Sequence, residues 1–239
     1  LTAEDARAQN NMALRKSIGQ GHMNVVRFLM EDLGLTADDA SANDNEGLKT
    51  ACEYGNIWVV RYLVDHFNLS LAGVVDPNAD HLLTICQMGH ARILHYLHEK
   101  GVLNNDHSRT LMLTEGYRRR DIVQFLMKDL GATIDDLVRH NVLINACQQG
   151  YNLVVKFLLD NGLTADHVRR SQVLEICSQQ GLVLTLCDLF EMTDLDAEDI
   201  AKDNYNVVRL ALDNNRTNVQ TFYANYLNIS KEDLPMLVR

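Results

Sequence analysis

The stretch at residues 51–64, ACEYGNIWVVRYLV, decides the fold, and a close copy, ACQQGYNLVVKFLL, occurs at residues 146–159. After each glycine, apolar residues fall at i, i+1, i+3 and i+4, which is one face of a helix. Before each glycine, small residues would let two antiparallel helices approach closely. Glycine itself readily adopts the positive φ that ends a helix. The stretch therefore predicts two antiparallel helices joined by a glycine turn.

The same pattern recurs along the chain. A leucine stands seven residues before each turn glycine, and another leucine stands eight residues after it. The glycines that share this spacing are Gly21, Gly55, Gly89, Gly150 and Gly181. Two further copies keep the spacing without the glycine and have Arg118 and Asn215 at the turn. Self-similarity of this kind predicts a row of stacked helix pairs.

A third signal marks the segment between one helix pair and the next. Residues that can cap a helix recur at spacings of 34, 34, 34, 29, 31, 32 and 34 residues. They are Thr2, Thr36, Ser70, Asn104, Thr133, Thr164, Asp196 and Ser230. In most copies an acid follows three residues later, namely Asp5, Asp39, Asp136, Asp199 and Asp233. A cap followed by such an acid is typical of a helix N-terminus, so we expect a short helical turn at each site.

Together these signals predict one domain over residues 1–239, an all-α solenoid of about seven helix-turn-helix repeats. The expected repeats are 2–35, 36–69, 70–103, 104–132, 133–163, 164–195 and 196–229, with a partial eighth from residue 230. The sequence starts and stops within the repeat phase. We therefore expect a piece of a longer protein, with natural termini as the alternative.

The copies at residues 51–64 and 146–159 resemble the ankyrin repeat family, whose unit has about 33 residues with two antiparallel helices and a turn. Two features differ from that family. Its T-P-L-H-x-A signature is replaced by EGLKTA at residues 46–51, and its β-hairpin by short capped helical turns such as that within GLTADDASANDN at 34–45. This divergent form is similar to the ankyrin-like arrays of amoebae, giant viruses and bacteria that inject effectors into host cells.

The resemblance implies a scaffold that binds another protein through its concave surface, and not an enzyme. It further implies a cytoplasmic location, or the host cytosol if the chain is part of a secreted bacterial effector. We expect a monomer without a cofactor. The alternative is an array that recruits substrate for a larger enzyme, whose catalytic domain lies outside this sequence.

Charge narrows the range of partners. The chain has 22 basic and 32 acidic side chains and a formal net charge of −10. This balance argues against nucleic acid as a partner, because binding to phosphates requires clustered cations. It also disfavours docking on anionic lipid. No stretch of about 18 uncharged apolar residues occurs, so we expect no membrane insertion.

Side chains that could carry chemistry have simpler explanations. Four of the five cysteines, Cys52, Cys86, Cys147 and Cys177, recur close to one register of the first helix, where cysteine serves as a small core residue. Cys187 is predicted to be the most exposed thiol, but no base accompanies it. His95 and His98 are spaced for one helix face, yet no further metal-binding motif supports them. We therefore predict no catalytic residue and no metal site.

The predicted partner-binding residues lie at the turns of three consecutive repeats. The residue directly before the turn position is polar in the other copies, which indicates that this position faces solvent. In the second, third and fourth repeats it is Tyr54, Met88 and Tyr117. Trp58 stands three residues after its turn, at a site that is polar in neighbouring repeats. Exposed aromatic residues in consecutive repeats are typical of an interface. Partial burial between repeats is the alternative.

A run of three arginines completes the predicted surface. Arg118, Arg119 and Arg120 take over the turn of the shortened fourth repeat, directly after Tyr117. They could pair with acidic groups of a partner. The alternative is a solvated turn that offsets part of the negative charge of the chain.

Overall fold

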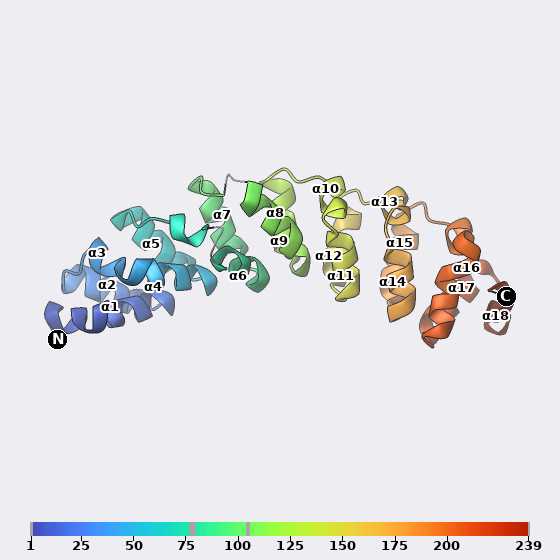
Figure 1. Cartoon of the computed structure of the whole chain (residues 1–239), viewed down its shortest axis with the longest axis horizontal. Coiled ribbons are helices and arrows are strands. Elements are labelled where there is room, and N and C mark those ends of the chain that lie inside the picture. The colour runs from blue at the N-terminus through green and yellow to red at the C-terminus, as the bar shows by residue number, and fades with distance from the viewer. Residues whose placement is uncertain (1, 77–79, 104–105, 239) are drawn as a thin grey trace. The chain divides into compact units, whose positions relative to one another are not determined.

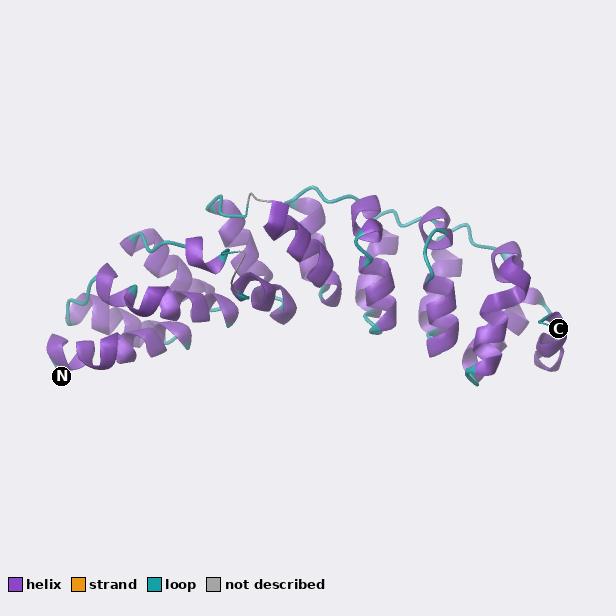
Figure 2. Ribbon diagram, viewed as in Figure 1, coloured by secondary structure: helices purple, strands orange, loops and turns teal. Residues whose placement is uncertain are grey.

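The computed structural model describes residues 2–76, 80–103 and 106–238, and its regular elements in these ranges are helices (Figure 2). No β-strand occurs in this part of the chain. The all-α prediction is therefore confirmed, whereas the assignment to ankyrin-like repeats stays a prediction.

The chain forms two compact units. The first comprises Leu1–Gly116 with Gln124–Leu130, and the second comprises Tyr117–Val123 with Gly131–Arg239. Two elements, η3 (Gly116–Arg118) and α9 (Arg120–Lys128), contribute residues to both units.

The first unit is built from helix pairs that follow one another along the chain (Figure 1). The helices α1, α4, α6 and α8 pack in that order, and α2, α5 and α7 pack against α1, α4 and α6 respectively. The elements are α1 (Ala3–Gly19), α2 (Met23–Arg27), the π-helical turn η1 (Phe28–Asp32), α3 (Ala37–Ala40), α4 (Ala42–Glu53), α5 (Ile57–Phe67), the 3₁₀ turn η2 (Ala72–Val74), α6 (His81–Met88), α7 (Ala91–Glu99) and α8 (Asp106–Glu115).

The second unit repeats this arrangement. Helices α11, α14 and α16 lie side by side, and the short helices α10 and α13 lie along one edge of that row (Figure 1). Helix α15 packs against both α12 and α17. The elements are α10 (Ile134–Arg139), α11 (Val142–Gln148), α12 (Asn152–Asp160), α13 (Ala165–Arg169), α14 (Val173–Gln180), α15 (Val183–Met192), α16 (Ala197–Asp213), α17 (Thr217–Leu227), η4 (Lys231–Asp233) and α18 (Leu234–Leu237).

The turns within the helix pairs confirm the role predicted for glycine. The five turn glycines have φ between +73° and +86°, a region that L-residues rarely adopt. The backbone N–H of Asn56, after Gly55, donates to the carbonyl of Ala51 over 2.9 Å, which closes the end of the first helix. Asn215 replaces glycine with a φ of 53°, which asparagine tolerates, and Arg118 instead ends a 3₁₀ turn.

The predicted helix faces form the core. In the second repeat, Leu48, Ala51, Val60 and Leu63 are completely buried. The four register cysteines are buried as well, and Cys187 is half-buried, as predicted. Burial raises the pKa of Cys52 to about 12, because a thiolate is poorly solvated in an apolar interior.

The predicted caps are formed in most repeats. Capping boxes, in which cap and third residue bond each other's backbone N–H, start at Thr2, Thr36, Thr133 and Asp196 with the expected acids. At Thr164 the third residue is His167, whose Nδ1 accepts the Thr164 backbone N–H. The helical turns expected at Ser70 and Ser230 are present as 3₁₀ turns: Ser230 is the N-cap of η4, whereas the N-cap of η2 is Leu71, one residue after Ser70. The remaining predicted cap, Asn104, lies outside the described residues.

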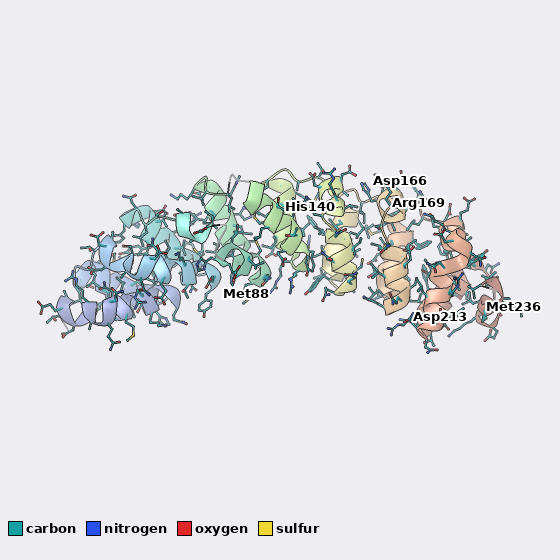
Figure 3. The ribbon with its side chains drawn as sticks, in the orientation of Figure 1. Met88, His140, Asp166, Arg169, Asp213 and Met236 are labelled. Carbon is teal, nitrogen blue, oxygen red and sulfur yellow. The ribbon has the colours of Figure 1, made fainter. Side chains whose placement is uncertain are left out.

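Two of the cap acids also join neighbouring repeats. Asp39 accepts two hydrogen bonds of 3.0 Å from Arg7, and Asp199 accepts bonds of 2.7 and 2.9 Å from Arg169. In Figure 3, Arg169 lies at the edge of the second unit that carries the short helices α10 and α13. These bonds hold the pKa of both carboxyl groups below the ordinary value of 3.8. Each acid thus stabilises its own helix and connects that helix to the preceding repeat.

Left-handed turns between the cap and the first long helix were not predicted. Residues 9–11, 43–45 and 203–205 have three consecutive φ values between +50° and +59°, and they interrupt α1, α4 and α16. Asparagine and aspartate are enriched in this conformation, and they hold seven of these nine positions; the other two are Gln9 and Tyr205.

Candidate functional site

Three predicted site residues of the first unit are exposed. Tyr54 follows α4 and is 55% exposed, Met88 ends α6 and is 53% exposed, and Trp58 in the first turn of α5 is 72% exposed. Met88 lies at the lower edge of the first unit in Figure 3. The predicted exposure of these residues, which we call the Trp58 cluster, is therefore confirmed.

The sequence of α5 explains why Trp58 faces solvent. Ile57, Val59, Val60 and Leu63 are buried and occupy the face that packs into the unit. Trp58 stands on the opposite face, one helical turn before Arg61. The buried face fixes the helix, so the indole is presented on a well-packed element and not on a loop.

Two hollows flank the outer face of α5. One, of about 580 Å³, lies between α5 and the α2–η1 segment, and the other, of about 490 Å³, lies between α5 and α7. Trp58 and Arg61 line both of them. The residues contributed by the neighbouring helices are Met23, Arg27 and Glu31 on the first side, and Arg92 and His95 on the second.

Charges in the first hollow are paired with one another. The Arg27 guanidinium lies 3.0 Å from Glu31, and the Tyr62 hydroxyl donates to Glu31 over 3.0 Å. These bonds lower the pKa of Glu31. Burial and the adjacent carboxylate raise the pKa of Tyr62 to about 12. This hollow therefore presents little unbalanced charge.

The hollow between α5 and α7, which we call the α5–α7 groove, is different. None of its lining residues is a carboxylate. Arg61 donates to Glu99 over 2.8 Å, and His95 Nδ1 lies 3.5 Å from Asp129. Arg92 is exposed, and within the described part of the chain its side chain has no hydrogen bond or ion pair. The groove is thus positively charged in a chain of net charge −10.

The remaining predicted residues belong to the second unit. The Arg118, Arg119 and Arg120 side chains are exposed, as expected, but Tyr117 is half-buried. Its ring lies 6.1 Å from the ring of Tyr151, and this contact explains the departure from the predicted exposure. The seven predicted residues therefore divide between the two units, three in the first and four in the second.

Aromatic rings hold two of these arginines. The Arg118 guanidinium lies 5.4 Å from the centre of the Tyr117 ring, and that of Arg120 lies 5.3 Å from the centre of the Phe157 ring. Such contacts favour a fixed position for the cation over a fully solvated one. We call Tyr117 with Arg118, Arg119 and Arg120 the Tyr117 cluster.

Sequence reasoning missed two exposed leucines in the second unit. Leu153 is 72% exposed and Leu184 is 68% exposed. Both stand three residues after a turn glycine, which is the register of Trp58. This shared register could have predicted their exposure, because the position three residues after the turn glycine lies on the face of the helix that does not pack into the core.

The remaining candidates for chemistry are the Cys187 thiol and groups of side chains that could hold a metal ion. Burial, followed by the charges of Glu191 and Asp188, raises the pKa of Cys187, which disfavours the reactive thiolate. Among the described residues, no group of three or more histidine, cysteine or acidic side chains is placed to hold a metal ion. In the same residues, no helix combines the length and apolar character needed to cross a bilayer.

Comparison with known proteins found no match to a family model, to a curated protein or to a solved structure. The resemblance to ankyrin repeats therefore rests on the residues and spacings of the chain itself.

Proposed function

We propose that this chain binds another protein, and that the Trp58 cluster with its flanking hollows is part of the binding surface. The observation that carries this proposal is the 72% exposed side chain of Trp58, which lies between two hollows on a packed helix. Tryptophan is enriched among the residues that dominate binding energy at protein interfaces.

The surroundings of Trp58 support the same function. Tyr54 and Met88 add further exposed apolar surface in the same unit, one at the end of α4 and the other at the end of α6. Each lies at a turn that a glycine of positive φ fixes. A surface assembled on successive rigid helix pairs needs little ordering when a partner binds.

The broader role belongs to the same proposal. Helix pairs with left-handed glycine turns and small packing residues support a divergent ankyrin-like scaffold. Such a scaffold would act within a bacterial effector in a host cell, as the resemblance implies.

Substitution of the exposed side chains tests the proposed function. In one variant Tyr54, Trp58 and Met88 are changed to serine, and in a matched control Leu184, Met192 and Met236, which are also exposed, are changed instead. Proteins captured by each variant from the native cell are then quantified, after circular dichroism has confirmed equal helicity. We expect the first variant to lose specific partners that the control retains. Equal capture by both variants would remove the Trp58 cluster from the binding surface.

A further inference from the structure

We infer that the α5–α7 groove binds an acidic peptide segment of the partner, with carboxylates on Arg92 and Arg61 and an apolar side chain against Trp58. This inference rests on the proposed function and specifies the chemistry of the partner.

Charge complementarity is the first argument. The chain has ten more acidic than basic side chains, yet the groove is lined by Arg61, Arg92 and His95 without a carboxylate. Arg92 lacks any partner among the described residues. A guanidinium presents a planar set of donors that matches the two oxygens of a carboxylate. An acidic segment would therefore supply the counter-charge that Arg92 lacks.

The position of Arg61 is the second argument. Its guanidinium lies 4.7 Å from the centre of the Tyr96 ring, and Tyr96 is completely buried. The Tyr96 hydroxyl donates to Asp65 over 2.8 Å, which fixes the ring. By contrast, the pair of Arg61 with Glu99 is solvent-exposed and therefore weak. The ring holds Arg61 in place while its outer donors stay available to a ligand.

The spacing of the four side chains is the third argument. Trp58 and Arg92 each stand three residues after a turn glycine, and Arg61 and His95 each stand six residues after it. Residues three apart on a helix lie on one face, so each helix contributes two side chains separated by one turn. The groove thus has an apolar platform beside cations. This arrangement fits a segment in which acids flank one apolar side chain.

The hollow on the other side of α5 does not fit this ligand. Its lining includes Glu31 and Asp65, and Arg27, the arginine that it does not share with the groove, is already bonded to Glu31. An acidic segment would meet carboxylates there. The inference is therefore specific to the α5–α7 groove.

Trp58 provides the readout, because it is the only tryptophan in the sequence. The probe is a synthetic twelve-residue peptide of glutamate and aspartate with a central leucine, blocked at both ends and fluorescently labelled. A second peptide has glutamine and asparagine in place of the acids. We expect the acidic peptide to shift the Trp58 emission and to bind in fluorescence polarisation, and we expect the amide peptide to do neither. Binding should weaken as salt is raised.

The decisive variant is Arg92→Gln, with Arg139→Gln as the matched control. Arg139 is an exposed arginine of the second unit, so both changes remove one positive charge. We expect Arg92→Gln to weaken binding of the acidic peptide by about three- to tenfold, the effect of losing one solvent-accessible charged hydrogen-bond pair. Arg139→Gln should leave the binding unchanged.

Three results would overturn the inference. The first is equal binding of the acidic and amide peptides, or no binding of either at millimolar concentration. The second is an equal effect of Arg92→Gln and Arg139→Gln. The third is a single-stranded twelve-nucleotide DNA that binds as tightly as the peptide and is equally sensitive to Arg92→Gln. Loss of partners in the serine variant, together with any of these results, would leave protein binding intact and reject only the acidic segment.

Discussion

At the scale of single residues, two completely buried tyrosines hydrogen-bond in different surroundings. The Tyr223 hydroxyl lies 2.6 Å from the hydroxyl of Ser178, which is also completely buried. The Ser178 hydroxyl in turn donates to the backbone carbonyl of Leu174. Tyr96 donates to Asp65, whose side chain still reaches solvent and also pairs with Lys100. When a buried polar group loses its hydrogen-bond partner, water cannot replace that partner. A solvent-accessible polar group can form the lost hydrogen bond with water instead.

We predict that Tyr223→Phe destabilises the chain by about 1 kcal/mol, the usual worth of one buried hydrogen bond. Tyr96→Phe should cost less, because solvent and Lys100 compensate Asp65. Urea unfolding followed by circular dichroism measures both free energies of unfolding. A greater loss for Tyr96→Phe would contradict this assignment of the two hydroxyl groups.

At the scale of elements, the short cap helices determine how neighbouring repeats connect. Asp199 accepts the backbone N–H of Asp196 at its own helix start and two bonds from Arg169 of the preceding repeat. Asp39 has the same arrangement with Thr36 and Arg7. The described part of the chain has no β-hairpins, and these contacts explain how neighbouring repeats are joined through their short cap helices instead.

The cap acids predict a loss of stability in acid. Hydrogen bonds from Arg169 hold the folded-state pKa of Asp199 below the ordinary value of 3.8. A carboxyl group of this kind contributes stability above its unfolded pKa, and that contribution disappears as pH falls through its folded pKa. We expect Asp199→Asn to lower the thermal midpoint at pH 7 and to matter progressively less below pH about 4.

Thermal unfolding of wild type and variant between pH 7 and pH 2 measures this effect. Asp203→Asn, which changes an exposed acid of the same helix, is the control. A difference between wild type and Asp199→Asn that stays constant down to pH 2 would show that ionisation of Asp199 does not stabilise the fold.

At the scale of the whole molecule, each unit joins helix pairs whose buried faces depend on their neighbours. The sequence predicts these pairs because the turn glycine, the small packing residues and the apolar spacing that determine each pair all lie within one repeat of about 30 residues. The turn glycines, the buried cysteines and most caps follow the prediction for this reason. Such features depend on the local chain and on one neighbouring helix.

Features that depend on side chains from different repeats were harder to predict. Tyr117 is half-buried because Tyr151 packs against it, and the sequence spacing does not reveal that contact. The charge of the α5–α7 groove depends on which of its arginines pair with acidic side chains, and Arg92 pairs with none among the described residues. The left-handed turns require three consecutive residues of positive φ without glycine, which the short Asn-rich clusters only suggest.

Site-specific crosslinking tests most directly whether Trp58 contacts a protein partner. A photoreactive phenylalanine derivative replaces Trp58 in one variant and Leu184, a similarly exposed residue of the second unit, in another. After irradiation in the native cell, mass spectrometry identifies the adducts. We predict that position 58 yields a discrete protein adduct and that excess acidic peptide suppresses it, while position 184 does not yield that adduct. The absence of an adduct at position 58, or the same adduct at both positions, would contradict the account.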